Sequence, residues 1–435
     1  MRTPYSLLCQ LLDFFLKRKK LCIFLVVVFF TIMGISALCR GGIGPPPRRT
    51  DLTVFLTAAE TIQLGENIYL IPNARGWYYM YLPLLAILLT PFTKLPLLLN
   101  TFMWYMLSVG SLCGSVILYS RLSEDRAAGM RAAVLATLFC VTAYLETMAR
   151  GQLGVMSVFQ AAAILYLYVK DKKVWAGLLF AFSVVLKASP LAPLVFLFLV
   201  KREWKMCAAI FLGIFFFAWV YPSLVLGVDQ NWFYVTEWHR IMSHAASDMG
   251  HQSHIWDQLV TPFAPDNQSM YAAVTRWVWP SEEVMISFGN FWVRTGTRVF
   301  GAIALFILCF VSRKKKSEIS TRRLMLEYSL FPMLMLLVSP VSETHHLTML
   351  FLMFVPAFLY LDELSPRSLA YQGIMWGVLI AFVTHIMGYI YPFDHWGFSG
   401  VGAFVFWCVL FIFLARKSLN VSQVPQEFPE SARLS

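Results

Sequence analysis

The sequence predicts an all-α polytopic membrane protein with about ten transmembrane crossings. The 435 residues are 58% hydrophobic and only 14% charged, whereas soluble domains are about a quarter charged. The apolar residues come in blocks of about 15–24 residues, near the length of a membrane-spanning helix. Such blocks must be helical, because there is no water in the bilayer core to satisfy an open backbone.

The distribution of charge predicts which side of the membrane each loop occupies. Most of the 35 lysines and arginines, including Lys17–Lys20 and Arg313–Lys316, fall in alternate loops. Because basic loops stay inside, we expect both termini in the cytoplasm and outer loops at 39–82 and 227–294. All eight histidines then lie at or near the outer face. The net charge of +11 reports topology, so no nucleic-acid partner is predicted.

Three regions are expected along the chain. Residues 1–20 form a cytoplasmic N-terminus, residues 21–415 the transmembrane domain, and residues 416–435 a disordered cytoplasmic tail. The eight cysteines have no CxxC or CxxH spacing and lie mostly in apolar blocks, where a thiol behaves as a small hydrophobe. Neither a disulfide framework nor a metal site is predicted.

The first outer loop is expected to contain a short interfacial helix. It follows the first span at about 21–38 and covers 52–65, with Thr50 or Asp51 as its N-cap. Its apolar residues recur at helical spacing, which is typical of a helix lying in the membrane interface. A half-helix bracketed by prolines follows at 82–92.

The remaining spans include one segment that must enter the membrane and return. Segment 174–200 has basic clusters on both flanks, so we expect a hairpin of two half-helices with Lys187 near the turn. The polar stretch 227–294 is the natural lid over an outer site. The other crossings are expected at 97–120, 132–148, 153–169, 206–226, 297–312, 324–340, 347–361, 369–391 and 398–414.

Asp51 is an acid at a membrane boundary and has two interpretations. It can cap the short helix beside Arg48 and Arg49. It can also be a general base, whose pKa desolvation would raise and the arginines would lower. Position alone leaves both interpretations open.

Arg150, Gln152 and Lys187 form a polar set near the outer face. Arg150 can snorkel at a helix end, but a lysine inside a Pro-broken hairpin is a functional candidate. Together with a histidine these residues would form a cationic pocket for an anionic headgroup. A leaving phosphate fits such a pocket, because its developing charge is what cationic donors stabilise.

The pair His345-His346 follows a Ser-Pro break at an outer helix end. The two are interfacial residues, metal ligands or donors to a phosphate. Adjacent helical residues point about 100° apart and do not easily share one metal. We therefore expect one histidine to donate a hydrogen bond and the other to be structural. The run His251–His254 is a weaker candidate.

Nucleotide chemistry is not indicated. The sequence has no Walker loop, no GxGxxG after a strand, no HExxH and no DxD pair. No cofactor is predicted.

The order of several short motifs resembles glycosyltransferase family 87, membrane enzymes of GT-C architecture that use polyprenyl-phosphate sugars. The motifs follow an acid just after the first span. They are Gly65-x-x-x-Tyr69, Tyr81-x-Pro83, Pro91 with a later Pro96, Arg150-Gly151-Gln152, Lys187-x-x-Pro190 and Ser339-Pro340-x-Ser342-x-x-His345-His346. The resemblance covers residues 21–415, and characterised members include α-mannosyltransferases and an arabinofuranosyltransferase.

The resemblance implies transfer of a sugar from a lipid monophosphate to an acceptor hydroxyl, with inversion at the anomeric carbon. Mannose is the first candidate for this sugar. Asp51 would be the catalytic base. The donor phosphate would be held by His345, His346, Lys187, Arg150 and Gln152. The substrate pocket is predicted to include Arg75, Tyr79, Tyr81, Gln252 and Glu343. Glu343 stands where the family commonly has an aromatic residue, so it could alter the preference for the donor sugar.

The predicted partners are the bilayer, a polyprenyl-phosphate sugar donor and a glycan or glycolipid acceptor, in a bacterial inner membrane. Two other functions stay open. A lipid-linked sugar transporter or flippase would use the same pocket but needs a pathway to the cytoplasmic side. A ligase or polymerase of the O-antigen type would take diphosphate-linked donors and would want more arginines in the large outer loop.

Overall fold

The chain was analysed as a computed structural model that describes residues 4–43, 50–187, 190–245 and 261–420. Over these residues the protein is helical, and the one β feature is an isolated antiparallel bridge between Asn267 and Glu343. The helices of the first half are α1 (Pro4–Lys17), α2 (Lys19–Leu38), α3 (Asp51–Gln63), α4 (Pro83–Leu89), α5 (Leu97–Leu122), α6 (Arg126–Phe139), α7 (Val141–Arg150), α8 (Gly154–Val169), α9 (Lys173–Leu186) and α10 (Leu194–Val200).

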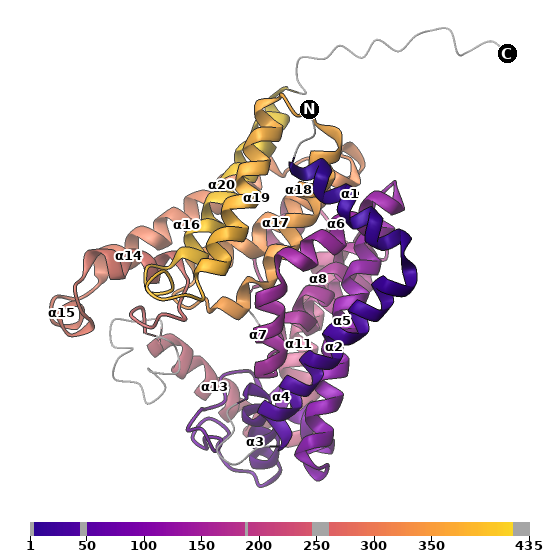
Figure 1. Cartoon of the computed structure of the whole chain (residues 1–435). Coiled ribbons are helices and arrows are strands. Elements are labelled where there is room, and N and C mark those ends of the chain that lie inside the picture. Colours follow the sequence, from indigo (N-terminus) through magenta and orange to yellow (C-terminus); the bar gives the residue numbers. More distant parts are fainter. Residues whose placement is uncertain (1–3, 44–49, 188–189, 246–260, 421–435) are drawn as a thin grey trace.

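The second half continues the bundle (Figure 1). Its helices are α11 (Trp204–Phe215), α12 (Tyr221–Leu226), α13 (Val228–Ala245), α14 (Met270–Val278), α15 (Glu282–Phe288), α16 (Phe291–Val311), α17 (Thr321–Val338), α18 (Leu350–Glu363), α19 (Leu369–Met387) and α20 (Phe398–Asn420). Short 3-10 or π turns extend α2 (Cys39–Ile43), α4 (Thr90–Lys94) and α11 (Phe216–Val220), and Lys316–Glu318 and Thr344–Met349 precede α17 and α18.

The helices that qualify as membrane spans by length and composition are fewer than the ten predicted crossings. Seven helices in the described part of the chain are long and apolar enough to cross a bilayer, or eight when the bent pair α6–α7 counts as one span. Two of the ten expected spans are missing from the set of eight. Helix α8 has only 16 residues, and α17 carries Arg322 and Arg323 in its first turn and Glu327 further along. Both helices are largely buried among the others, where a helix needs neither full length nor an apolar face.

The bundle has two chemically distinct ends. At one end, Lys173 pairs with Glu203 at 2.7 Å and Lys201 with Glu327 at 2.6 Å; we call this the basic end. The other end holds Asp51, Arg150 and Lys187, and we call it the site end. Helix α9 starts at the Lys173–Glu203 pair and ends at Lys187, and α10 leads back to Lys201. The predicted hairpin is confirmed, with its flanks together and Lys187 at the far end.

Both ends of the described chain lie at the basic end. The Tyr5 hydroxyl in α1 donates to the carbonyl of Phe358 at 3.1 Å. Lys417 in α20 lies with its Nζ 4.7 Å from the centre of the Tyr360 ring. In Figure 1, α1 and the end of α20 are accordingly close to the end of α18. Helix α20 continues to Asn420, through the first five residues of the predicted tail, and residues 421–435 lie outside the described part.

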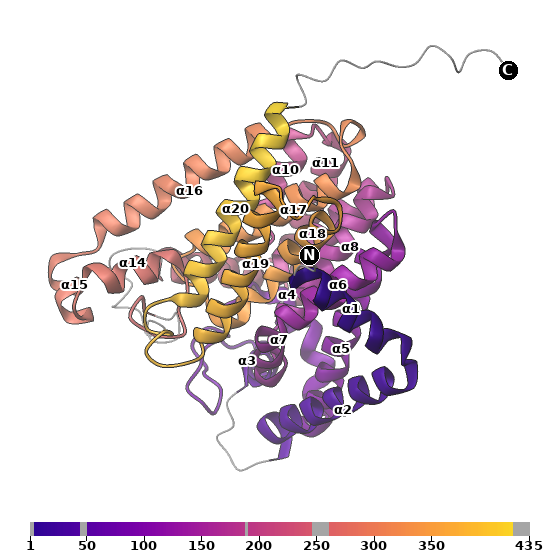
Figure 2. The same cartoon turned by 45° about the horizontal axis from the view of Figure 1, so that its top comes forward.

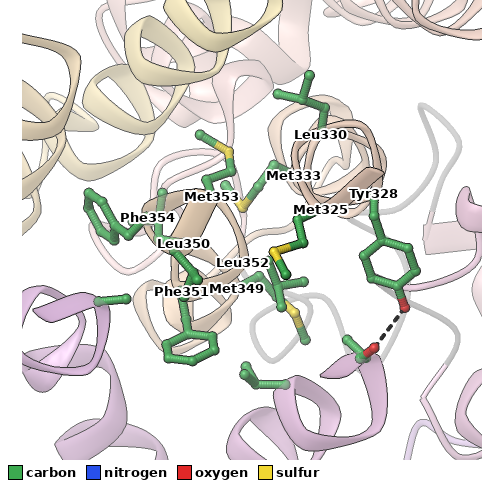
Figure 3. Packing of buried hydrophobic residues seen from close by; sticks show 14 of the residues in the cluster. Met325, Tyr328, Leu330, Met333, Met349, Leu350, Phe351, Leu352, Met353 and Phe354 are labelled. Atoms are coloured by element: carbon green, nitrogen blue, oxygen red, sulfur yellow. Dashed lines mark hydrogen bonds between the residues drawn. The ribbon is translucent and has the colours of Figure 1, made fainter. Parts of the chain in front are cut away.

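The core is built around α18, which is enclosed by other helices for almost its whole length. Figure 3 shows Met325, Tyr328 and Met333 of α17 facing the segment Met349–Phe354. The hydroxyl of Tyr328 is satisfied, since it donates to the Ala161 carbonyl of α8 at 3.0 Å. Flexible methionine side chains fill the gaps between the branched and aromatic ones.

Helices α9 and α11 approach closely because small residues face each other. A Cβ at Gly177 would lie 2.7 Å from both the Ala209 Cβ and the Met206 carbonyl oxygen. Small residues at such crossings let helix backbones pack without a side-chain spacer, as in membrane bundles generally. The crossing fixes α9, which carries Lys187 to the site end.

A second apolar cluster lies at the site end and contains the apolar stripe of α3. Nine of its 13 residues are buried, under α4, the segment 68–81 and α13. The cover is hydrogen-bonded in place, because Tyr234 donates to the Glu66 carbonyl at 2.7 Å and Trp238 to the Met80 carbonyl at 3.1 Å. The apolar stripe of α3 therefore packs inside the protein.

The described part of the long outer stretch, residues 227–245 and 261–294, is mostly helical. It holds α13, α14 and α15, and α16 starts at Phe291, six residues before the predicted span. In both views α15 lies at the far side of the molecule, away from α3 and α4 (Figures 1 and 2). Asn267, which begins an Asn-Gln-Ser triplet of the N-glycosylation pattern, is fully buried and donates to the Pro340 carbonyl at 2.9 Å.

Candidate active site

The site begins where the N-terminus of α3 meets the C-terminus of α7. Gly151 ends α7 in the left-handed conformation, with φ of +69°, which glycine adopts without steric cost. A Cβ at this position would lie 2.9 Å from the Cβ of Leu52. The glycine thus permits both the turn after Arg150 and the close approach of α3, which brings Asp51 to Arg150.

Arg150 lies among three carboxylates. Its Nε is 3.5 Å from Oδ2 of Asp51, and its Nη1 is 3.1 Å from Glu146 and 2.9 Å from Glu343. The acids come from α3, α7 and the turn before α18, so one guanidinium connects three elements. A donor phosphate would have to replace one of these carboxylates, so the assignment of Arg150 to phosphate binding stays a prediction.

Asp51 is not the cap of α3. Thr50 occupies the N-cap position, Asp51 is the first helical residue, and neither side chain makes a capping hydrogen bond. The cap interpretation is therefore wrong. Asp51 is 8% exposed, and its Oδ2 accepts no hydrogen bond from any described residue.

The surroundings of Asp51 act on its pKa in opposite directions. Burial raises the pKa above the usual value for an aspartate, and this effect exceeds the lowering by the charges of Arg150 and His345. Glu343 adds a further rise through repulsion between like charges. A buried carboxylate with a raised pKa and an oxygen free of hydrogen bonds is suited to take a proton from a substrate.

Lys187 lies at the end of α9 with its ammonium inside the protein. Its Nζ donates to Oε1 of Gln152 at 3.2 Å and lies 5.9 Å from the centre of the Tyr81 ring. Burial lowers the pKa of Lys187 to about 8, although Glu343 and Asp51 favour its charged form. The residues Lys187, Gln152 and Tyr81 were all predicted for the site, and the structure brings them together.

The two histidines have different environments. His345 is fully buried with its Nδ1 3.3 Å from Glu343, and Thr147 of α7 donates to its carbonyl at 3.2 Å. His346 is partly exposed, and its Nδ1 accepts a hydrogen bond from the Glu343 backbone N–H at 3.1 Å. An accepting Nδ1 leaves the proton of a neutral imidazole on Nε2. His346 therefore presents an N–H donor, while His345 supports Glu343.

Glu343 is held as a carboxylate at the centre of this group. Burial alone would raise its pKa, but His345 and Arg150 keep the pKa well below its usual range. Asp51 and Glu343 both contact the guanidinium of Arg150. In the part of the chain that the structure describes, no group of three His, Cys, Asp or Glu residues is arranged to hold a metal ion.

Other predicted pocket residues lie further out. Tyr79 is buried in the cluster around α3, and its hydroxyl donates to the Leu82 carbonyl at 2.8 Å. Arg75 stacks on Trp77 at 3.4 Å, and Arg150 lies 5.5 Å from the centre of the same ring. Trp77 thus links Arg75 to the site. Gln252, with the His251–His254 run, lies outside the described residues.

Sequence reasoning missed Glu146, which connects the site to a pocket. Its Oε2 accepts hydrogen bonds from the hydroxyls of Thr344 at 2.7 Å and Tyr389 at 2.9 Å, while Oε1 binds Arg150. Glu146 precedes Arg150 by four residues on a helix, a spacing that predicts an ion pair. Thr344 and Tyr389 carry no comparable signal in the sequence.

Glu146 lines a pocket of about 610 Å³ between α2, α7 and α19. Two further acids, Asp266 and Asp394, line it, and Arg40 is its only basic residue. Glu146 therefore joins this acidic pocket to Arg150, whose guanidinium also contacts Asp51 and Glu343.

Comparison with known proteins identifies the family. Residues 79–340 match the sequence model of glycosyltransferase family 87. The chain belongs to glycosyltransferase family 87. It is a glycosyltransferase, and with its spans a multi-pass membrane protein. The matched residues include Arg150, Gln152 and Lys187 but not Asp51 or the histidine pair, which the structure adds by contact.

Solved structures were compared as well. The chain is similar to ArnT from Cupriavidus metallidurans bound to undecaprenyl phosphate, with a TM-score of 0.39, 12% identity, and coverage of 91% of this chain and 77% of that one. It is also similar to the apo state of ArnT, with a TM-score of 0.41, 12% identity, and coverage of 92% and 78%. No curated protein matches the chain.

Proposed function

We propose that this family 87 enzyme transfers a sugar from a polyprenyl-phosphate donor to an acceptor hydroxyl at the site end. Mannose is the first candidate for this sugar. The observation that supports the proposal most strongly is the position of Asp51. Its buried carboxylate contacts Arg150, on the side of the bundle where Lys187 and His346 also lie. Family membership decides for an enzyme over a transporter.

The reaction is an in-line displacement at the anomeric carbon. The acceptor oxygen forms a bond to that carbon while its proton passes to Asp51. The bond from the same carbon to the phosphate oxygen breaks, and its electron pair leaves with the phosphate. The configuration at the anomeric carbon is inverted, because the acceptor attacks opposite to the leaving group.

Lys187, Gln152 and His346 are proposed to hold the donor phosphate. The ammonium of Lys187 is buried, and the Nε2–H of His346 is a partly exposed donor. Both would stabilise the charge that develops on the leaving phosphate. Arg150 acts as a positioning residue, because its guanidinium holds Asp51, Glu146 and Glu343.

The acidic pocket is proposed to take the acceptor. Ionised carboxylates only accept hydrogen bonds, so Glu146, Asp266 and Asp394 suit the hydroxyls of a sugar and repel a second phosphate. Glu146 and Asp51 contact the same guanidinium. This shared contact supports an acceptor site next to the proposed base.

Orientation in the membrane follows from charge. The basic end carries the lysine and arginine clusters, so we propose that it faces the cytoplasm and that the site end faces outward in a bacterial inner membrane. The fold is proposed to be of the GT-C type, with both termini cytoplasmic.

The test is an assay of the purified protein with polyprenyl-phosphate mannose and a panel of methyl glycosides. Transfer that needs the monophosphate donor supports the proposal. Transfer only from polyprenyl-diphosphate-linked sugars would show a ligase or polymerase instead. An enzyme that transfers from the monophosphate equally well with Asp51→Asn would overturn the assignment of the base.

A further inference from the structure

The basic end contains a second pocket, far from the site end. It has a volume of about 210 Å³ and lies where the C-terminal ends of α5, α18 and α20 meet the first turn of α17. Arg322, Tyr360, Glu363 and Lys417 line it. We propose that this pocket binds a phosphoryl group, carried by inorganic phosphate or by the headgroup of an anionic phospholipid.

Tyr360 supplies the strongest observation. The residue is 1% exposed and lines the pocket, and its hydroxyl has no hydrogen-bond partner among the described residues. Buried hydroxyls are almost always paired, because an unpaired one loses its hydrogen bonds to water without replacement. A ligand oxygen would accept this bond once the flexible side chains of Arg322 and Lys417 beside the ring move to admit it.

Two cations lie against the same ring. The guanidinium of Arg322 is 5.9 Å and the ammonium of Lys417 4.7 Å from its centre. They come from α17 and α20, so the fold brings together two residues that are far apart in the sequence. Hydrogen bonds between charged donors and phosphate oxygens are short and strong.

The first turn of α17 adds backbone donors. Ser320 caps this 18-residue helix by accepting from the Arg323 N–H at 3.3 Å. The amides of Thr321 and Arg322 come before the first residue that can bond within the helix, and both residues line the pocket. Helix N-termini favour anions through such amides and the helix dipole.

Two acids also line the pocket and set its affinity. Glu363 forms an ion pair with Arg322 and is about half exposed, at 54% of its side chain. Glu124 is exposed. Glu363 therefore competes with an anion for Arg322, which predicts that its neutralisation tightens binding.

The size of the pocket limits the ligand. It is smaller than the roughly 300–1,000 Å³ that encloses a drug-sized molecule. A phosphoryl group with its first substituent fits, whereas a nucleotide does not. The position at the end of membrane-crossing helices suits a lipid headgroup, and the chemistry suits free phosphate equally.

The test uses the full-length protein in detergent, with unfolding followed by the fluorescence of its 14 tryptophans. The unfolding temperature is titrated with sodium phosphate or with dihexanoyl phosphatidylglycerol, and sodium chloride keeps the ionic strength constant. A ligand that binds the folded state raises this temperature with saturation. We expect a saturating rise with one or both probes. Phosphate alone would identify free phosphate, and the lipid alone a headgroup.

Four variants make the test specific. Tyr360→Phe removes only an unpaired hydroxyl, so it should fold normally and raise the dissociation constant about tenfold. Arg322→Gln and Lys417→Gln should weaken binding at least as much, and Glu363→Gln should strengthen it. Arg367→Gln, an exposed cation at the same end outside the pocket, should change nothing. A wild-type protein without a saturating shift would overturn the proposal, as would equal shifts in Tyr360→Phe and wild type.

Discussion

Arg150 and Asp51 lie in contact, with Nε and Oδ2 3.5 Å apart, although they belong to helices that the sequence places in separate segments. The contact depends on Gly151, where a side chain would collide with Leu52. It makes the first outer segment part of the same site as the end of α7. Asp51 precedes the residues that match the family 87 model, and Arg150 lies among them, so the contact joins Asp51 to the matched region.

The first prediction concerns Asp51 as the base. Asp51→Asn keeps the shape of the side chain but removes its ability to take a proton, so kcat should fall about 10²–10⁴-fold. The KM for the donor should change little, because Asp51 does not hold the phosphate. Glu60→Gln is the control, since Glu60 is an exposed acid on the same helix. Equal kcat in Asp51→Asn and Glu60→Gln would contradict the prediction.

The second prediction concerns Lys187 and pH. With its pKa lowered to about 8, the ammonium is charged below that pH and neutral above it. A neutral amine no longer attracts phosphate, so the KM for the donor should rise as pH increases through about 8. In Lys187→Arg the group stays charged at every working pH, and this alkaline rise should disappear. A rise that persists in Lys187→Arg would assign it to another group.

Much of this site was predictable, because patterns of residues close together in the sequence indicate its turns and helices. The turn at Gly151 and the hairpin that carries Lys187 follow from residue types and flanking charge. The Glu146–Arg150 pair could also have been read from its helical spacing. The contact of Glu343 with Arg150 could not, because nothing in either segment encodes their distance.

The difference between the ten predicted crossings and the seven or eight candidate spans has a similar physical origin. The sequence shows the apolar content of a helix but not which faces other helices cover. Glu327, which lies within the predicted span at 324–340, is fully buried between Lys201 and Arg323, and the sequence does not show that these two cations compensate its charge. Helix α3 was assigned to the interface for the corresponding reason, since its apolar stripe does not say whether lipid or protein covers it.

The third prediction separates the two histidines. His346→Ala removes the proposed Nε2–H donor and should raise the KM for the donor about tenfold, with little change in unfolding temperature. His345→Ala removes a fully buried ring beside Glu343 and should lower the unfolding temperature instead. Steady-state kinetics and thermal unfolding of both variants provide the measurement. The reverse pattern would exchange the two roles.

The last prediction concerns the charged group inside the basic end. Lys201 donates to Glu327 at 2.6 Å and to the carbonyl of Ser312 at 3.1 Å, and Arg323 donates to the same glutamate at 2.8 Å. Two cations thus share one buried carboxylate. Glu327→Gln leaves both without an anion and should cost about 3–5 kcal/mol of stability.

Removing the cation Lys201 should cost less stability than removing the acid Glu327. Lys201→Met leaves the pair of Arg323 and Glu327 balanced, so it should cost less than Glu327→Gln. Adding Lys201→Met to Glu327→Gln should recover part of the loss, because one unpaired buried cation is removed. Thermal unfolding in detergent measures the three variants, with Glu318→Gln as an exposed control at the same end. If the double variant is less stable than Glu327→Gln, Lys201 stabilises the fold through its carbonyl contacts and not through the carboxylate.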